Sequence, residues 1–256
     1  MAGTRGRGAR AGGVPRTPQR PRNDPRQYDD LADEWWRPDG AFAALHWLAA
    51  ARAAAVPRPR EPGALLVDVG CGAGLLAPHL SGRGFRHVGV DLTASALTRA
   101  RDAGVEVVQG DAARLPLGDA AAEVVVAGEI LEHVGDLAST VAECCRILAP
   151  GGTLVVDTIA GNPLARLVVG RVQERLPGGP PPRIHDPALF VSPRRLRVLC
   201  NAHGVRLRTH ALTVHPLDYL RFLVDRRRPV RMRPGGAPLT VYQAIGWRPA
   251  ESHSYG

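Results

Sequence analysis

The sequence predicts an α/β fold on a mostly parallel sheet whose last strand is antiparallel. Two observations indicate this fold. Apolar segments of strand length, at 65–69 and then at 87–90, are separated by a segment typical of a helix. The first strand ends in a glycine-spaced loop, and the second ends at Asp91, twenty-one residues after Gly70. Such a loop and such an acid meet at the carboxyl edge of a parallel sheet, so we expect a nucleotide-type cofactor there.

The glycine-spaced loop at 70–74 indicates which kind of cofactor it serves. Glycine is needed where the backbone turns tightly and approaches a ligand directly, which makes Gly70 and Gly72 candidate cofactor residues. Asp68 precedes the turn, where a carboxylate would repel a pyrophosphate but suits a cationic ligand. Asp91 is placed to accept hydrogen bonds from both ribose hydroxyls. The alternative is a dinucleotide site of the NAD or flavin kind, whose usual glycine spacing differs from the G-x-G-x-G found here.

The remaining strands follow in the same alternating order. A third strand at 105–108 leads to Asp111, whose carboxylate can meet the adenine amino group of a cofactor. Further strands are predicted at 123–127, 154–159, 205–214 and 241–247, the last two antiparallel. The motif D-x-G-x-G-x-G, with an acid after the second strand, resembles the Rossmann-like, seven-stranded methyltransferase fold. That resemblance implies S-adenosylmethionine as the cofactor.

Composition divides the chain into three parts. Residues 1–27 are rich in Arg, Gly and Pro with almost no large apolar side chains, so we expect a disordered tail. Residues 28–247 form the predicted methyltransferase domain, and 248–256 a flexible C-terminus. Within the domain, 161–183 is an insertion whose apolar helical face is flanked by arginines. This pattern fits either a lid or membrane-facing segment, or an ordinary helix packed on the sheet.

The net charge of +9 is local rather than uniform. Residues 1–27 carry +6 and residues 183–233 carry +9, whereas residues 28–182 carry −6. Few aromatic side chains lie among these arginines, so nucleic acid is not the expected partner; RNA binding or RNA methylation is an alternative. The chain has four cysteines without C-x-x-C spacing, no apolar run of membrane-spanning length and no secretory signal. We therefore expect a cytoplasmic protein. If the insertion is membrane-facing rather than packed on the sheet, it would make peripheral contact with an anionic membrane.

The E-x-x-E-H run after the fourth strand carries the candidate catalytic chemistry. If the chain enters a helical turn here, positions i, i+3 and i+4 place Glu129, Glu132 and His133 on one face. Two carboxylates and an imidazole so arranged can bind Mg²⁺, Mn²⁺ or Zn²⁺; a site without a metal is the equal alternative. Without a metal, His133 is the expected base. His185 is the second candidate, with the adjacent Asp186 expected to orient its imidazole.

Further motifs extend along the domain. They are YDDLADEWW at 28–36, GAF at 40–42, LH at 45–46, EILEHV at 129–134, HD at 185–186 and FVSP at 190–193. Together with the glycine loop, they resemble the ubiquinone-biosynthesis O-methyltransferase (UbiG-type) family over roughly residues 28–247. The resemblance implies methyl transfer to phenolic hydroxyls on polyprenylated rings, and association with membranes.

The same resemblance assigns site residues. Arg52 matches an arginine that would reach the methionine carboxylate of the cofactor. Gly70 and Asp91 match loop and ribose positions, and Gly128 matches a further cofactor-lining position. The resemblance also supports a metal at the E-x-x-E-H run. A Met is common where this chain has Gly128, and this difference lies near the expected substrate side.

These observations predict an S-adenosylmethionine-dependent O-methyltransferase. Its expected acceptor is a phenolic or catecholic hydroxyl of an apolar small molecule, of the polyprenylated quinone-precursor kind. A phenol with a pKa of about 10 is a poor nucleophile at neutral pH, so the reaction needs a base or a metal. The alternative within enzymes is a natural-product O- or C-methyltransferase with a soluble substrate.

Overall fold

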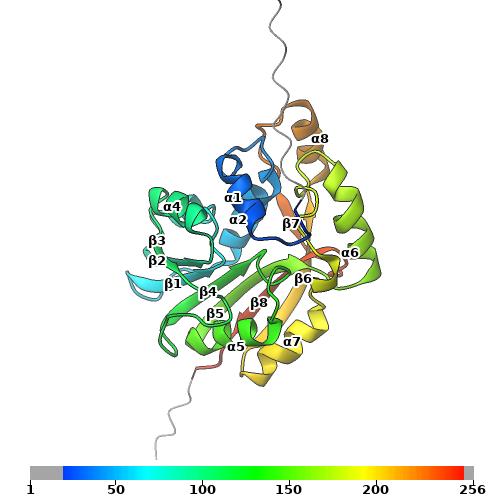
Figure 1. Cartoon of the computed structure of the whole chain (residues 1–256). Helices are drawn as coiled ribbons and strands as arrows, with labels where there is room; N and C mark the ends of the chain where they lie inside the picture. Colours follow the sequence, from blue (N-terminus) through cyan, green and yellow to red (C-terminus); the bar gives the residue numbers. More distant parts are fainter. Residues whose placement is uncertain (1–19, 251–256) are drawn as a thin grey trace, which may run out of the picture.

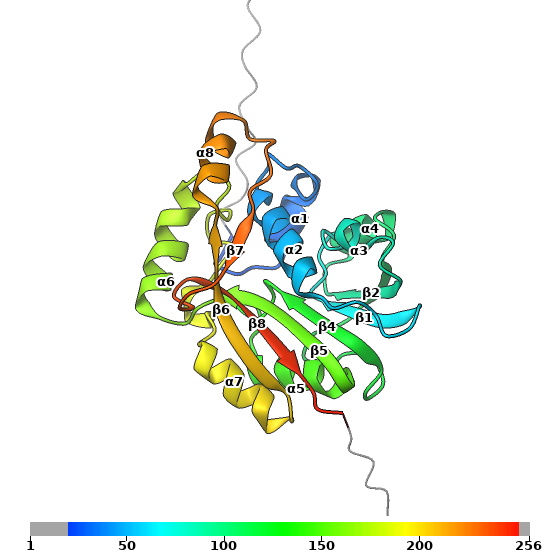
Figure 2. The same ribbon diagram turned by 180° about the vertical axis from the view of Figure 1, so that it is seen from behind.

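The computed structural model describes residues 20–250, built around one eight-stranded sheet (Figures 1 and 2). Residues 1–19 and 251–256, which hold most of the predicted tail and C-terminus, lie outside the described residues. The strands are β1 (Ala64–Val69), β2 (Phe85–Asp91), β3 (Glu106–Gln109), β4 (Ala122–Gly128), β5 (Leu148–Ile159), β6 (Arg206–Val214), β7 (Met232–Pro234) and β8 (Val241–Trp247). Their order is β3-β2-β1-β4-β5-β8-β6-β7. The first five pair in parallel, so their carboxyl ends share one edge.

Helices cover both faces of this sheet (Figures 1 and 2). They are α1 (Arg26–Asp30), α2 (Ala43–Ala55), α3 (Ala77–Leu80), α4 (Ala94–Asp102), α5 (Leu137–Ile147), α6 (Pro163–Leu167), α7 (Pro193–Ala202) and α8 (Pro216–Val224). Alternate strand residues face opposite sides: Val67 and Val125 pack with α5 and α7, whereas Leu66 and Val124 pack with α2 and α3. Because both faces are covered, the central strands are continuous apolar runs in the sequence.

The two antiparallel strands that the sequence predicts are present, and the structure adds a third antiparallel strand beside them. β5 pairs antiparallel with β8, and β8 pairs antiparallel with β6. These two strands are the ones predicted at 241–247 and 205–214. The additional strand, β7, has three residues and pairs with the end of β6. A three-residue run that ends in Pro234 carries no strand signal, which is why seven strands were expected. The mostly parallel α/β fold is confirmed.

Part of the predicted tail belongs to the folded structure. Residues 20–27, expected to be disordered, lead into α1, which begins at Arg26. Asp24 accepts hydrogen bonds from the backbone and the guanidinium of Arg26, and Arg20 pairs with Asp30. The tail prediction was therefore wrong for these residues, because charge-assisted contacts order them where apolar burial could not.

The insertion at 161–183 forms a short helical rod followed by a loop. It consists of α6, a π-helical turn (Val168–Val172) and a 3₁₀ turn (Gln173–Arg175). Val169 is buried against the body of the protein, whereas Leu164, Leu167 and Val172 are about half exposed. The rod therefore packs on the domain through one side and presents a second apolar side to the surface. No helix in the described part of the chain is long and apolar enough to cross a bilayer.

Candidate active site

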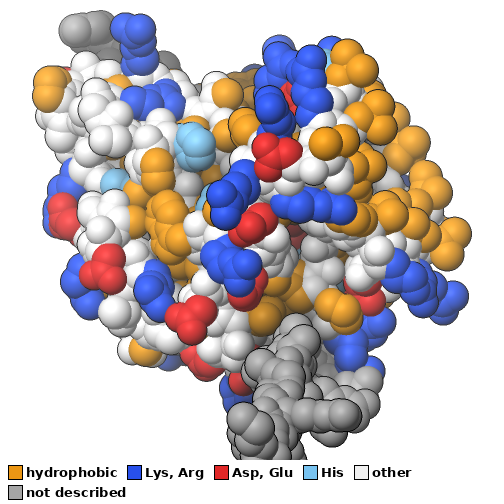
Figure 3. Space-filling view, turned by 90° about the horizontal axis from the view of Figure 1, so that it is seen from above, with side chains coloured by type: hydrophobic (Ala, Val, Ile, Leu, Met, Phe, Trp, Pro, Cys, Tyr) orange, Lys and Arg blue, Asp and Glu red, His pale blue; other side chains and the backbone are white. Residues whose placement is uncertain are grey.

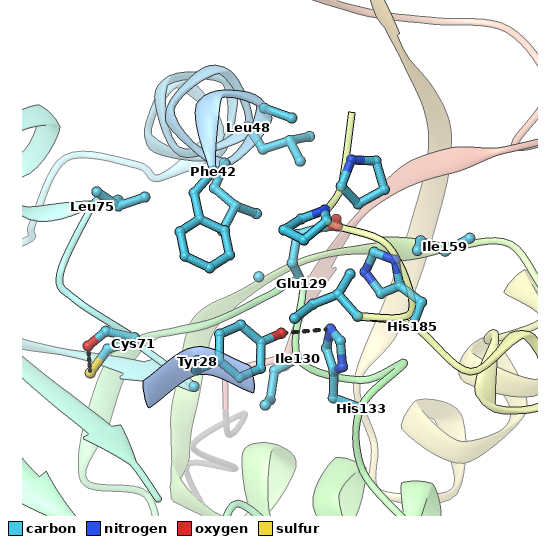
Figure 4. Close-up of a pocket in the computed structure, with 18 of the residues that line it drawn as sticks. Tyr28, Phe42, Leu48, Cys71, Leu75, Glu129, Ile130, His133, Ile159 and His185 are labelled. Atoms are coloured by element: carbon cyan, nitrogen blue, oxygen red, sulfur yellow. Dashed lines mark hydrogen bonds between the residues drawn. The ribbon is translucent and has the colours of Figure 1, made fainter. Parts of the chain in front are cut away.

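A cavity of about 650 Å³ opens beyond the carboxyl ends of β1, β2 and β4 (Figure 4). We call its two parts the strand-end half and the apolar half. The strand-end half is lined by Asp68, Gly70, Gly72, Asp91, Asp111 and Gly128. The apolar half is lined by Phe42, Trp47, Leu48, Val169, Ile184, Tyr219 and Met232. His133 and His185 lie near one another on its wall, beside Tyr28 and Ile130.

The glycine loop and Asp91 hold each other at the ends of β1 and β2. Gly72 N–H donates to Asp91 Oδ2 at 2.9 Å, and Thr93 N–H donates to Oδ1 at 2.8 Å. Gly70 has a left-handed φ of +70°, and a Cβ there would lie 2.6 Å from Ile130 Cγ1, so conformation and space both require glycine. Burial raises the pKa of Asp91, and the backbone N–H groups oppose that rise. Each carboxylate oxygen keeps a further lone pair for a ligand hydroxyl.

Asp68 and Asp111 complete the strand-end half. Asp68 is 3% exposed, and its Oδ2 lies 3.6 Å from Nε2 of His87 on the neighbouring strand. Asp111 follows β3 and accepts a hydrogen bond from Ala113 N–H at 2.8 Å. The structure thus brings all the predicted strand-end residues to one cavity, although they come from four different strand ends.

Arg52 reaches the cavity from α2 and is paired with an acid that the sequence analysis missed. Its Nε and Nη2 donate to Oδ1 and Oδ2 of Asp157, both at 2.6 Å. Burial alone would lower the pKa of Arg52, but Asp157 outweighs this effect and the pKa is raised, so the guanidinium stays charged. Asp157 is fully buried in β5. An acid inside an apolar strand is costly without a partner, and that was the signal available in the sequence.

The E-x-x-E-H run does not form the predicted helical turn. Glu129 has a left-handed φ of +53°, and the next helix begins only at Leu137. Glu132 is fully buried and accepts a hydrogen bond from Thr158 Oγ1 at 2.6 Å. Loss of water raises the pKa of both carboxyls, that of Glu132 to about 7. The predicted helical spacing of this run was therefore wrong, because the chain bends at Glu129 and passes into a short turn instead of a helix.

A different trio of side chains converges. One potential ligand atom each from Glu132, His133 and His185 lies within 4.8 Å of the others, and in the described part of the chain Glu129 does not join this group. Oε1 of Glu132 and Nδ1 of His185 are buried without a hydrogen-bond partner among the described residues. Buried polar atoms are normally hydrogen-bonded, so these two unpaired atoms are available to contact a bound ligand or cation. Of the three residues expected to bind a metal, Glu132 and His133 therefore belong to this group, whereas Glu129 does not and His185 does.

His133 is held by the N-terminal segment. Its Nδ1 lies 2.5 Å from Asn23 Oδ1, and its Nε2 lies 3.2 Å from Tyr28 Oη (Figure 4). The rings of His133 and His185 are 5.0 Å apart between centroids. Burial lowers the pKa of both imidazoles, that of His133 to about 4. Both are therefore neutral at neutral pH, the form that accepts a proton or binds a metal.

Asp186 does not orient His185, contrary to the sequence prediction. Its Oδ1 accepts a hydrogen bond from Ala188 N–H at 2.9 Å and caps the short turn Pro187–Leu189. Phe190 instead packs edge-on against the His185 ring, at 6.2 Å between centroids. The side chain that does fix an imidazole here, Asn23, lies in the segment that composition assigned to the tail, so no sequence signal pointed to it.

Segments far apart in the sequence build the apolar half. Trp47 of α2 packs edge-on against Phe222 of α8, at 4.9 Å between centroids. Val169 of the insertion and Met232 of β7 add aliphatic walls. Of the arginines in the described residues, only Arg52 lines the cavity, and Asp157 already pairs with it. The apolar half therefore suits an uncharged, apolar group.

Comparisons with known proteins agree with this geometry. Residues 67–156 match the family described as "Methyltransferase domain". A ubiquinone biosynthesis O-methyltransferase from Hahella chejuensis is 34% identical over 205 residues, which cover 75% of this chain and 84% of that one. The protein of the same name from Thiobacillus denitrificans is 36% identical over 202 residues, covering 73% and 83%.

Solved structures share the fold at lower sequence identity. An S-adenosylmethionine-dependent methyltransferase from Thermotoga maritima, titled a possible histamine N-methyltransferase, is 19% identical with a TM-score of 0.62; 87% of this chain and 97% of that chain are covered. A putative Haloferax volcanii methyltransferase, solved with its Trm112 activator, is 21% identical with a TM-score of 0.60, covering 87% and 98%. With the sequence relatives, these findings show that the chain is an S-adenosylmethionine-dependent methyltransferase and belongs to the ubiquinone biosynthesis O-methyltransferase family.

Proposed function

We propose that the protein transfers the methyl group of S-adenosylmethionine to a phenolic or catecholic hydroxyl on an apolar ring of the polyprenylated quinone-precursor kind. The observation that carries this proposal is the continuity of the two halves of one cavity, with His133 and His185 on the wall of the apolar half. The names of the sequence relatives support the ubiquinone-precursor class. Among the described residues no arginine other than Arg52, which is paired with Asp157, lines the cavity, and this supports an acceptor ring without an acidic substituent.

The strand-end half suits each part of the cofactor. Asp91 would accept hydrogen bonds from the ribose hydroxyls, and Asp111 would meet the adenine amino group. Arg52 would bind the methionine carboxylate, and Gly70 would let the backbone approach the cofactor closely. Asp68 adds negative charge that favours a cationic sulfonium over a pyrophosphate.

Methyl transfer from a sulfonium is an in-line displacement. The phenolic oxygen forms a bond to the methyl carbon while the carbon–sulfur bond breaks, and S-adenosylhomocysteine leaves. The phenolic proton must go to a base. His133 is our candidate and His185 the second because both neutral imidazoles line the cavity, although burial also makes each a weaker base than a free imidazole. The walls of the cavity must hold oxygen, methyl carbon and sulfur in line, about 3 Å from oxygen to carbon.

The converging trio also fits a divalent cation. Glu132, His133 and His185 offer one oxygen and two nitrogens, and Glu132 Oε1 and His185 Nδ1 are buried without a partner in the described structure. Both ring nitrogens of His133 have hydrogen-bond partners, so a cation would have to displace the Tyr28 hydroxyl from Nε2. This mixed donor set suits Zn²⁺ or Mn²⁺ better than Mg²⁺, which prefers oxygen. A bound cation would supply positive charge that stabilises a phenolate. We expect calorimetry to show that binding of Mn²⁺ and Zn²⁺ to the cofactor-free protein is lost in Glu132→Gln and kept in Glu106→Gln. Glu106 is the control because it is exposed on β3 and does not line the cavity.

Two segments that line the apolar half, the rod through Val169 and α8 through Tyr219, also carry exposed apolar side chains, which support contact with an anionic membrane. The rod of the insertion presents Leu164 and Leu167, and α8 presents Leu217 and Leu220, each 46–59% exposed. Hydrophobic side chains gather along one side of the molecule, with arginines beside them (Figure 3). Arginines beside an apolar face are typical of segments that lie in a membrane interface. A prenyl chain could enter the cavity from the bilayer between these segments.

Vesicle binding tests the membrane contact. We expect the protein to sediment with phosphatidylglycerol vesicles, and the pair Leu164→Glu and Leu220→Glu to reduce the bound fraction several-fold. Val198→Glu is the matched control, because Val198 is 61% exposed on α7, outside both segments. Equal loss in the control would show that any added charge weakens binding, and the proposed contact would then be wrong.

The catalytic proposal is tested by a methyl-transfer screen. Catechols with and without a prenyl chain are offered with labelled S-adenosylmethionine, in the presence and absence of EDTA. Turnover that favours prenylated catechols supports the proposal, and sensitivity to EDTA adds the cation. Turnover only on polar, unprenylated phenols would favour a natural-product methyltransferase with a soluble substrate.

A further inference from the structure

Arg52 and Asp157 form a buried pair at the wall of the cavity. Arg52 is in the last turn of α2, and Asp157 is near the end of β5. Two parallel hydrogen bonds of 2.6 Å join the guanidinium side edge to the carboxylate. The side chain of Arg52 is 9% exposed and that of Asp157 is 0% exposed. Both groups are thus fixed in place, and Arg52 still lines the cavity.

Gly128 makes room for this pair. A Cβ on Gly128 would lie 1.9 Å from Cζ and Nε of Arg52, far inside any permitted contact. Gly128 does not have a left-handed φ, so its backbone conformation does not require glycine. The requirement is for space: the guanidinium lies directly on the Gly128 α-carbon. In this chain a larger residue here would displace the Arg52 guanidinium from its paired position on Asp157; relatives with a Met here must therefore place their arginine differently.

Stability alone does not account for the pair. Burying two charges removes them from water, and an apolar pair of similar volume often stabilises a fold as well or better. Asp157 uses two of the five guanidinium N–H groups, which leaves three on the end that includes Nη1. Because Asp157 holds the guanidinium through Nε and Nη2, the opposite edge, formed by Nη1 and Nη2, is fixed in an orientation that can bind a second carboxylate.

We propose that Asp157 and Gly128 are positioning residues for the cofactor. Asp157 fixes the side edge of the Arg52 guanidinium, Gly128 leaves the space that it occupies, and the free edge binds the methionine carboxylate. This inference rests on the assignment of Arg52 to that carboxylate in the proposed function. It is independent of the methyl acceptor, of the cation and of the membrane contact.

Ligand binding with and without the carboxylate tests the proposal. S-adenosylhomocysteine carries the amino-acid group, and 5′-methylthioadenosine keeps adenine, ribose and sulfur but lacks that group. By calorimetry, Gly128→Ala should weaken S-adenosylhomocysteine about tenfold or more, because charge-assisted hydrogen bonds are lost. The same variant should bind 5′-methylthioadenosine within about twofold of the unchanged protein. Asp157→Asn, which keeps the shape but not the charge, should show the same selective loss.

Gly118→Ala is the matched control. Gly118 has no atom within 4 Å of an added Cβ and no left-handed φ, and it does not line the cavity. It should bind both ligands as the unchanged protein does, and melting curves should show every variant folded before titration.

Two results would overturn the proposal. Equal weakening of both ligands by Gly128→Ala would mean that the added methyl group distorts the whole strand-end half. Tighter binding of S-adenosylhomocysteine by Asp157→Asn would mean that Asp157 competes with the cofactor carboxylate for Arg52. A failed methyl-transfer screen would leave these binding results intact, so the two proposals fail separately.

Discussion

The two halves of the cavity are built in different ways. In the strand-end half, parallel strands deliver Asp68, Asp91 and Gly128 to one edge, and backbone N–H groups hold Asp91. In the apolar half, segments from both ends of the chain meet, and side chains such as Trp47 and Phe222 hold them together. The order of the parallel strands thus fixes the positions of the residues in the strand-end half, whereas contacts between segments distant in the sequence shape the apolar half.

A clasp between the N-terminal segment and the insertion shows this difference most clearly. Arg22 Nη1 donates to Glu174 Oε1 and to the His185 carbonyl, both at 3.0 Å. Asn23 N–H donates to the Arg183 carbonyl at 3.1 Å. These partly exposed polar contacts close the apolar half, so it can adapt to an acceptor at lower cost than the strand-end half.

The largest expected effect separates the halves chemically. His133→Ala removes the candidate base, or one candidate cation ligand, and should reduce kcat by about 100-fold or more. Its affinity for S-adenosylhomocysteine should stay within about twofold, because His133 lies outside the strand-end half. Initial-rate assays measure kcat and calorimetry measures the affinity. His203→Ala is the control, because His203 is exposed directly after α7 and does not line the cavity. A comparable loss of cofactor affinity would contradict the division into two halves.

Asp91→Ala is the converse change, in the strand-end half. Loss of the ribose hydrogen bonds should weaken S-adenosylmethionine binding by about 1–3 kcal/mol. At saturating cofactor, kcat should change far less, since the variant leaves the apolar half intact. Asp102→Ala, at the exposed end of α4, is the matched control in calorimetric titrations. Unchanged affinity in Asp91→Ala would show that the ribose lies elsewhere.

The same division explains what the sequence could and could not predict. The glycine loop and Asp91 were predictable, because a strand, a turn and the next strand are local features whose meeting point follows from parallel topology. Asp157 could have been predicted as a buried acid near a strand end. Asn23 could not, because its partner His133 is 110 residues away and composition around it favours disorder. The helical spacing expected from Glu129 onward could not be tested in the sequence, because it fails through one residue, Glu129, whose backbone φ is left-handed.

A smaller effect is expected from opening the clasp. Arg22→Ala removes the pair with Glu174, and partly exposed ion pairs contribute about 0.2–1 kcal/mol. The KM for the methyl acceptor should therefore rise about twofold to fivefold, while cofactor affinity stays the same. Arg26→Ala is the control, because Arg26 pairs with Asp24 inside the N-terminal segment itself. If cofactor affinity fell as much as acceptor KM rose, the clasp would serve both halves.

The smallest effect concerns pH and the anchoring of α8 beside the apolar half. Arg231 donates to Asp218 at 2.6 Å and holds the pKa of that carboxyl at about 2, below its ordinary value. A lowered folded-state pKa stabilises the fold above the ordinary pKa, and this contribution is lost as pH falls toward 2. Asp218→Asn should therefore melt slightly below the unchanged protein at pH 6, and the gap should close between pH 4 and pH 2. Asp225→Asn, at an exposed ion pair, should show no such closing gap. A gap that persists at pH 2 would mean that Asp218 anchors α8 through its shape and hydrogen bonds rather than its charge.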